Sequence, residues 1–293
     1  MRRTRRCLCR LRLAPVTLAL ALTPARSWCS HTRACHYYAG EPTPYAWPDI
    51  NSHFGILDIA GFEKARTHWY RAWFAQPSPP ELFILPHWDW DAATNSTIDV
   101  WVYSNADAVE LLVNGASQGR QVMQRYSHVQ WTVAYAPGSV QALAYVNGTA
   151  QPVAVAWRNT TGSPAALIAS IKDGVGATLY AGCADVALVA VAVVDASGAV
   201  VPTAVNNVTF SVSGPATLAG TGNGDPACHT NDKSAMRPAY HGLVLAVIAG
   251  GTTPGSVTVT ATSPGLTPSS VVIPVAAPDA TVSSAWCHLE PTM

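Results

Sequence analysis

The stretch that decides the fold of this sequence lies between residues 40 and 74. It reads Gly40-Glu-Pro-Thr-Pro-Tyr-Ala-Trp-Pro-Asp-Ile-Asn-Ser-His-Phe-Gly-Ile-Leu-Asp-Ile-Ala-Gly-Phe62 and continues as Glu63–Phe74. A loop rich in proline and aromatic residues leads into the apolar, strand-like segment Phe54–Ile59. In Glu63–Phe74 two aromatic pairs have a spacing of four residues, which predicts a helix with each pair on one face: Trp69 with Trp73 and Tyr70 with Phe74. A loop, a short strand and a helix cannot bury their apolar faces alone, so we expect this unit to be the end of a larger fold.

This stretch resembles the last loop and helix of the catalytic (β/α)₈ barrel of glycoside hydrolase family 2, in the β-galactosidase branch. There, a Gly-Glu-Pro-Thr-Pro-Tyr loop leads into an Asn-Ser-x-Phe-Gly-Ile-x-Asp-x-x-Gly-Phe segment. The sequence has the loop at Gly40–Tyr45 and the segment at Asn51–Phe62. The resemblance implies that residues 40–75 are the last loop and helix of a glycosidase barrel. It also implies that Phe62, Trp69 and Trp73 dock on the rest of that barrel.

Beyond the helix the sequence changes to short runs of β-branched and aromatic residues. The proline-rich run Gln76–Pro80 cannot continue a helix and marks a boundary. Asn114-Gly115 and Asn147-Gly148 are dipeptides that favour hairpin turns. Residues 76–160 are therefore predicted to form a first antiparallel β-sandwich. The preceding helix, Glu63–Phe74, is expected to pack on it. The expected strands are Leu82–Leu85, Ile98–Tyr103, Val109–Val113, His128–Tyr135, Val140–Val146 and Val153–Trp157.

A second sandwich with immunoglobulin-like spacing is predicted over residues 161–277. Gly220-Thr-Gly-Asn-Gly-Asp-Pro226 is expected to form a tight irregular loop, and Asp195–Gly198 a hairpin turn. The expected strands are Ala166–Ile171, Val186–Val194, Val208–Ser213, Leu243–Ile248, Val257–Thr262 and Val271–Val275. No signal is found in the tail, residues 278–293.

Both predicted sandwiches resemble the domains that follow the barrel in the same β-galactosidase branch. The strings that carry this resemblance are Leu85–Trp90, Val100–Ala106, Glu110–Gly115, Gly220–Pro226, Arg237 and Gly242–Leu245. The resemblance covers about residues 40–276. It implies a mostly β fold of two tandem immunoglobulin-like antiparallel β-sandwiches, preceded by a loop-helix remnant of a (β/α)₈ barrel.

The composition favours β-sandwiches and argues against nucleic acid as a partner. Charged residues make up only 12% of the 293 residues, whereas hydrophobic residues make up 49%. Eight of the 17 basic residues, all Arg, lie in residues 1–40, and the first acidic residue is Glu41. The remaining body is acidic, which argues against nucleic acid as a partner. No stretch reaches the roughly 18 consecutive apolar residues of a membrane span.

Residues 1–39 are expected to lie outside the fold. Four Arg within the first six residues precede Leu11–Leu22, an apolar stretch of signal-peptide length, and Thr23 and Ala25 provide small residues at cleavage-like spacing. A secretory signal is therefore favoured, and an organellar transit peptide is the alternative. A misassigned exon is a third explanation of this leader.

Sequons agree with passage through a secretory pathway. Candidate glycosylation sites are Asn95, Asn147, Asn159 and Asn207. Cysteines add little, because Cys183, Cys228 and Cys287 allow at most one disulfide among them and do not show its pairing. No Cys/His spacing suits a metal, so neither a metal nor another cofactor is expected.

A complete catalytic pair cannot be found in this sequence. Retaining glycosidases need two carboxyl groups about 5–5.5 Å apart, and in family 2 both are Glu on earlier barrel strands. The five Glu, at positions 41, 63, 81, 110 and 290, offer no such pair, so no catalytic residue is assigned. The resemblance places Glu41, Tyr45, Trp47, Asn51 and His53 near the substrate of a whole enzyme. Loop packing is the simpler explanation for His53.

Two further groups of residues have a structural and a functional interpretation. Tyr45, Trp47, Trp88, Trp90 and Trp101 could stack on a sugar ring, but we expect such residues to fill cores and interfaces. Asn223 and Asp225 could bind a cation, but turn chemistry explains them more simply.

Two functions remain from the sequence. The favoured one is a C-terminal part of a β-galactosidase-like glycoside hydrolase, whose partner is the catalytic barrel of the same enzyme. The alternative is a secreted carbohydrate-binding or adhesion module made of two β-sandwiches, with carbohydrate as its ligand. The loop and helix in residues 40–75 favour the first, because a binding module has no use for them.

The leader generates a first testable prediction. Chain collected from the culture medium of a eukaryotic host should begin just after Ala25, because signal peptidase cleaves after small residues. N-terminal sequencing measures the new end. An intact N-terminus in secreted material, or retention in an organelle, would contradict the signal interpretation.

Overall fold

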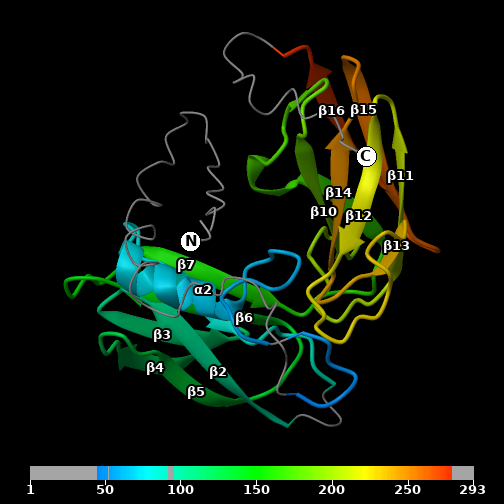
Figure 1. Ribbon diagram of the computed structural model, residues 1–293. Coiled ribbons are helices and arrows are strands. Elements are labelled where there is room, and N and C mark those ends of the chain that lie inside the picture. The colour runs from blue at the N-terminus through cyan, green and yellow to red at the C-terminus, as the bar shows by residue number, and fades with distance from the viewer. Residues whose placement is uncertain (1–44, 52, 92–95, 279–293) are drawn as a thin grey trace, which may run out of the picture. The chain divides into compact units, whose positions relative to one another are not determined.

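The computed structural model describes residues 45–51, 53–91 and 96–278 (Figure 1). The expected leader, Glu41, Asn95, Cys287, Glu290 and the tail lie outside these residues. The described part is mostly β, as the sequence predicts. Within it, no helix has both the length and the hydropathy needed to cross a bilayer.

The aromatic helix is present but ends in a wider turn than the sequence predicts. It consists of α2, Ala65–Tyr70, which continues as a π-helical turn, η2, Arg71–Ala75. Gln76 ends the helix in the left-handed region with φ 46°, and its amide donates to Arg71 O. Before the helix, the expected strand Phe54–Ile59 is reduced to a single β-bridge between Leu57 and Glu63.

Two antiparallel sheets lie within residues 82–159. The first contains β1 (Leu82–Leu85), β2 (Thr97–Ser104) and β5 (Val129–Ala134), in the order β1-β2-β5. The second contains β3 (Ala108–Val113), β4 (Ala116–Val122), β6 (Ser139–Tyr145) and β7 (Ala154–Asn159), in the order β4-β3-β6-β7. Both sheets contribute alternate side chains to one core, with Val100, Leu111 and Val140 fully buried. The two sheets therefore form the predicted sandwich.

The helix packs on this first sandwich. Ala72 and Trp73 belong to the same core cluster, and the indole Nε1 of Trp73 donates to Ser127 O at 3.3 Å. Trp73 thus contacts the first sandwich, and its docking on a barrel stays a prediction. The π-helical turn adds one residue, so that Trp69 meets Phe74 rather than Trp73, with ring centroids 6.0 Å apart.

Two further sheets lie within residues 166–276. One contains β8 (Ala166–Ile171), β10 (Val186–Val194), β12 (Ala216–Gly222) and β14 (Leu243–Gly250), in the order β12-β14-β10-β8. The other contains β9 (Leu179–Tyr180), β11 (Asn207–Ser213), β13 (Met236–Pro238), β15 (Gly255–Thr262) and β16 (Ser269–Ala276), in the order β13-β11-β15-β16-β9. A short 3₁₀ turn, η3 (Lys172–Gly174), follows β8. Val189, Val191, Ile248 and Ile273 are among the buried side chains that join the two sheets.

Most predicted strands are confirmed, and four strands were missed. β1, β8 and β10 begin and end at the predicted residues. The missed strands are β4, β9, β12 and β13. The pairing of β9 with β16 is parallel, so the second sandwich is not wholly antiparallel. The string Gly220–Pro226 is only partly a loop, because Gly220–Gly222 complete β12 after a bulge that follows Leu218.

The predicted hairpin dipeptides have the backbone that they favour. Asn114 and Gly115 have φ values of 48° and 81° between β3 and β4. Asn147 and Gly148 have φ values of 53° and 67° after β6. Both residues of each dipeptide are left-handed, as a type I′ turn requires.

Asp195 organises the predicted turn after β10. Its Oδ1 accepts hydrogen bonds from the amides of Ser197 and Ala199, and its Oδ2 accepts one from the amide of Gly162 at 2.8 Å. The hydrogen bond from Gly162, together with those from Ser197 and Ala199, lowers the pKa of Asp195 to about 2. The same carboxylate thus fixes its own turn and the connection that precedes β8.

Asp195 generates a prediction on acid stability. Because its folded-state pKa of about 2 lies below the unfolded value, its contribution to stability is complete above about pH 4 and is lost as the pH falls toward 2. Asp195→Ala should lower the urea midpoint at pH 7 and make the midpoint less sensitive to pH between 4 and 2. Asp173→Asn, which removes an exposed carboxylate and keeps a side chain that tolerates the φ of 52° at this position, is the control. Equal acid sensitivity of wild type and Asp195→Ala would contradict this role.

Candidate functional site

The candidate site predicted from the sequence is a loop in which three side chains stack or pair. The ring of Tyr45 stacks on that of His53, with centroids 4.1 Å apart and planes at 19°. His53 Nε2 lies 3.0 Å from Asp49 Oδ2. Tyr45 and His53, which are both predicted to lie near a substrate, are thus in contact with each other. Asn51 is half-buried, and Glu41 lies outside the described residues.

Trp47 does not join this stack, but pairs with a histidine from the second sandwich. Its side chain is 78% exposed. The ring lies 4.3 Å from the His229 ring at 40°. His229 Nε2 donates to Pro48 O at 2.8 Å, and the Ile50 amide donates to Pro226 O at 2.9 Å. Residues 47–50 are therefore held by the loop that follows β12.

That loop, residues 223–235, is itself held by a buried cation, Arg237 of β13. Arg237 is only 2% exposed. Its guanidinium donates to Thr221 O at 2.6 Å, to Thr230 O at 2.9 Å and to Asp232 Oδ1 at 2.7 Å. These bonds span both sides of His229 and so fix the position from which it meets Trp47. Arg237 also reaches Cys228 Sγ at 3.4 Å.

Cys228 is a free thiol, and Cys183 is disulfide-bonded. Burial alone would raise the pKa of Cys228, but hydrogen bonds from Thr230 and Arg237 hold it below its ordinary value. The thiol is half-buried beside the guanidinium.

The structural explanation of Asn223 and Asp225 is confirmed. Asn223 Nδ2 donates to Pro238 O, and its Oδ1 accepts from the Asp225 amide. Asp225 Oδ1 in turn accepts from the Ala227 amide at 2.9 Å. These are turn-forming bonds. No group of three or more His, Cys, Asp or Glu in the described part of the chain could hold a metal ion.

Asp58 makes the turn that joins the loop to the helix. Its Oδ1 accepts from the amides of Ala60 and Phe62, each at 2.9 Å. Burial raises the pKa of Asp58 in spite of these bonds. Its other oxygen faces Gly224, where a Cβ would lie only 2.0 Å from Oδ2. Gly224 therefore allows the turn to lie directly against the loop that carries His229.

The predicted aromatic cluster is divided among three places. Trp88 is buried in the first core, and its Nε1 donates to Ala136 O. Trp90 lies over His87, with ring centroids 4.6 Å apart. Trp101 stacks on His128 at 4.1 Å and is 38% exposed. The core interpretation is right for Trp88, whereas Trp47 and Trp101 remain exposed.

Comparison with known proteins places these features in a family. A family model described as Glycoside hydrolase family 2 C-terminal domain 5 matches residues 176–272, and a domain of unknown function matches residues 95–151. A β-galactosidase of Bacteroides ovatus is 40% identical over 229 residues, which are 77% of this chain and 26% of that protein. The chain belongs to glycoside hydrolase family 2.

Two further similar proteins are glycosidases by name. A β-glucuronidase of Formosa agariphila is 31% identical over 187 residues, 63% of this chain and 18% of that protein. The crystal structure of a β-glycosidase from Bacteroides vulgatus superposes with a TM-score of 0.73 at 26% identity, covering 81% of this chain and 30% of that chain. The chain spans about a quarter or less of the curated relatives it matches.

In a family 2 chain the glutamates are the first candidates for catalysis. Those within the described residues are each bound to other side chains of this chain. Glu81 Oε1 lies 2.6 Å from His68 Nδ1 and 3.2 Å from Arg71 Nη1. Burial alone would raise the pKa of Glu81, but His68 and Arg71 hold it below its ordinary value. Glu63 pairs with Arg71 at 2.5 Å. Hydrogen bonds from Ser117 and Tyr145 hold the pKa of Glu110 below its ordinary value.

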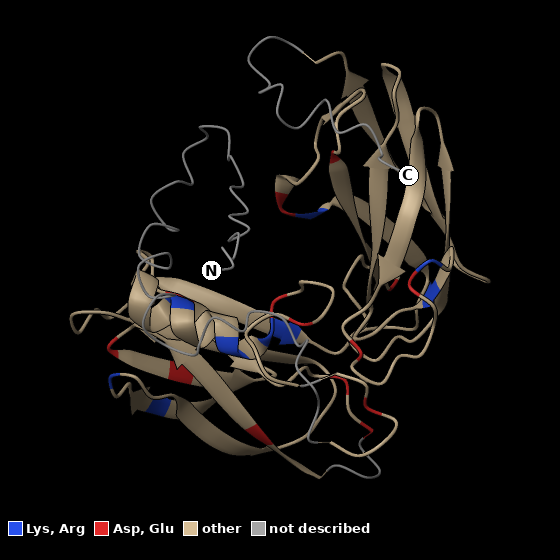
Figure 2. Ribbon diagram, in the orientation of Figure 1, with Lys and Arg blue, Asp and Glu red and all other residues tan. Residues whose placement is uncertain are grey.

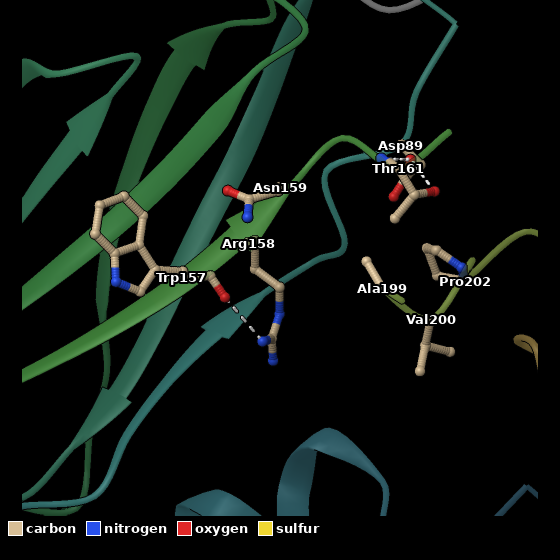
Figure 3. Close-up of a pocket in the computed structure, with 8 residues that line it drawn as sticks. All are labelled: Asp89, Trp157, Arg158, Asn159, Thr161, Ala199, Val200 and Pro202. Carbon is tan, nitrogen blue, oxygen red and sulfur yellow. Dashed lines mark hydrogen bonds between the residues drawn. The ribbon is translucent and has the colours of Figure 1, made fainter. Parts of the chain in front are cut away.

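A hollow of about 350 Å³ lies where β7 ends (Figure 3). Arg158 occupies the middle of this view, and its Nη1 donates to Trp157 O at 3.1 Å. Asp89 is already engaged, because its Oδ1 accepts from the amide and hydroxyl of Thr161. The sequence prediction did not include this hollow. Its lining residues are Asp89, Trp157, Arg158, Asn159, Thr161, Ala199, Val200 and Pro202.

Gly224 generates a prediction on the packing of the candidate site. Gly224→Ala should lower the free energy of unfolding by about 1–3 kcal/mol, because the methyl group has no room beside Asp58. It should also expose residues 45–61 to proteolysis. Urea unfolding and limited proteolysis are the measurements.

Gly222→Ala is the matched control for this prediction. It lies two residues away, and its Cβ would make ordinary contact at 3.8 Å with Ala60. Equal effects of the two substitutions would show that the close approach of Asp58 to Gly224 is not needed.

Proposed function

We propose that this chain is the non-catalytic C-terminal part of a β-galactosidase-like glycoside hydrolase, an enzyme class that hydrolyses O-glycosyl bonds. In this proposal the loop and helix in residues 45–75 complete the catalytic barrel of the same enzyme. The two sandwiches support this loop and helix. The loop contributes Tyr45, Trp47 and His53 to the rim of the substrate site.

One observation carries the proposal. The segment that resembles the end of a barrel is bonded into the β-structure at both of its ends. At the helix end Trp73 lies in the first core, and at the loop end Ile50 bonds to Pro226 and Trp47 contacts His229. A bracing role requires such contacts.

A galactoside is the favoured substrate of the whole enzyme. The B. ovatus relative with 40% identity is named a β-galactosidase, whereas the β-glucuronidase of F. agariphila has 31% identity. Retaining glycosidases use a pair of carboxyl groups. The glutamates at positions 63, 81 and 110 do not form such a pair, because they are bound to His, Arg, Ser or Tyr. The chemistry therefore belongs to the barrel strands of the whole enzyme.

Secretion is part of the proposal. Three of the four candidate glycosylation sites, Asn147, Asn159 and Asn207, have exposed side chains that a glycan could occupy. An organellar location remains the alternative.

A carbohydrate-binding module is the second candidate function. The exposed ring of Trp101, stacked on His128, favours it, because aromatic faces bind sugar rings. Against it stands the helix, whose Ala72 and Trp73 are buried in the first core. The bracing role explains both the helix and the loop, so it is preferred.

Activity of the purified chain tests the proposal. The chain alone should not hydrolyse aryl β-galactosides, because neither a proton donor nor a nucleophile has a partner at the required separation. Release of nitrophenol is the measurement, with the B. ovatus β-galactosidase as the positive control. Any residual turnover should be the same for Glu41→Gln. Robust turnover that Glu41→Gln abolishes would overturn the assignment.

A further inference from the structure

Arg158 has no counter-charge in the part of the chain that the structure describes. Its side chain lies on the inner face of β7, with the guanidinium carbon 4.6 Å from the centroid of the Phe83 ring. Its hydrogen bond to Trp157 O uses one of five N–H donors. Within the described residues no carboxylate lies within salt-bridge distance of Arg158, whereas the other two arginines that are not exposed, Arg71 and Arg237, each have one.

This arrangement costs free energy in the isolated chain. Burial lowers the pKa of Arg158, and no neighbouring charge opposes that shift. A desolvated charge is normally paired, since the loss of hydration is otherwise uncompensated. The contact with Phe83 supplies only part of the compensation.

The surroundings of Arg158 indicate which kind of chemical group would pair with its charge. The Phe83 ring also stacks on His68 of α2, with centroids 3.7 Å apart. Arg158 therefore lies at the seam where α2 meets β1. Figure 2 shows basic residues along this helix and its π-helical continuation, but Arg71 is already paired with Glu63 and Glu81. An acidic group would therefore be complementary to the guanidinium of Arg158 itself.

We propose that an acidic side chain from the preceding, catalytic part of the same enzyme binds Arg158 and anchors that part against α2 and β1. This inference rests on the proposed function. The relatives extend far beyond the matched region, since the chain covers only 26% of the B. ovatus β-galactosidase. Arg158 fits a carboxylate partner because its planar fork makes two parallel hydrogen bonds to one carboxylate.

A small acidic sugar fits the same place less well. Trp157 and Arg158 are adjacent on β7, so their side chains point to opposite faces, and a sugar bound to the guanidinium cannot stack on the indole.

The test compares one substitution in two settings. In the isolated chain, Arg158→Met should raise the thermal midpoint by about 2–6 °C, because it removes an unpaired charge and keeps the contact with Phe83. In a B. ovatus β-galactosidase whose matching region is replaced by residues 45–276 of this chain, the same substitution should lower the midpoint by a similar amount. Arg125→Met, at an exposed site beside Tyr126, is the control and should change neither midpoint.

The outcomes separate the two proposals. An unsubstituted chimera that does not hydrolyse aryl β-galactosides counts against the proposed function. A midpoint of the isolated chain that Arg158→Met lowers or leaves unchanged overturns the inference on Arg158, whatever the chimera does. A rise in the wild-type midpoint with galacturonate, absent in Arg158→Met, would show that a small acid is the occupant and would also overturn it. Arg158→Gln serves as a second variant if Arg158→Met does not fold.

Discussion

The buried guanidinium of Arg237 is the interaction on which the candidate site depends. A fully desolvated charge is tolerated only when its hydrogen-bonding groups are satisfied. Arg237 meets this condition with acceptors on both sides of the loop after β12, namely Thr221, Thr230 and Asp232. A lysine could not replace it, because an ammonium group has no planar fork with which to span them. Through this loop the cation fixes His229 and Pro226, and through these it fixes residues 47–50.

The sequence predicts those parts of the fold where local pattern and burial agree. β10 alternates buried and partly buried positions, and its bounds are predicted correctly. β4 has the opposite character, since it is an exposed, polar strand at a sheet edge and shows no alternation. β12 contains two glycines and a bulge, which are typical of a loop when read from sequence alone. These two missed strands thus lack the local alternation by which a strand is recognised in a sequence.

The candidate site shows the same division between local and distant partners. Tyr45 and His53 lie only eight residues apart in one loop, and their rings stack. His229 lies 181 residues from Pro48, its hydrogen-bond acceptor, and no local pattern marks it. Arg158 did leave a signal, because it occupies an inward-facing position in the strand Ala-Val-Ala-Trp-Arg-Asn. An arginine at an inward-facing position predicts that another group pairs with its charge.

The π-helical turn at Arg71–Ala75 has a consequence for the evolution of this region. Its extra residue lets Ala72 and Trp73 reach the first core while Tyr70 and Phe74 stay together on another face. Loss of one residue here would restore an ordinary helix and rotate every later side chain by about 100°. Trp73 would then leave its place beside Ser127, and an apolar gap would open in the core. This helix therefore needs its exact number of residues. Homologous recombination within it would have to preserve the extra residue of the π-helical turn.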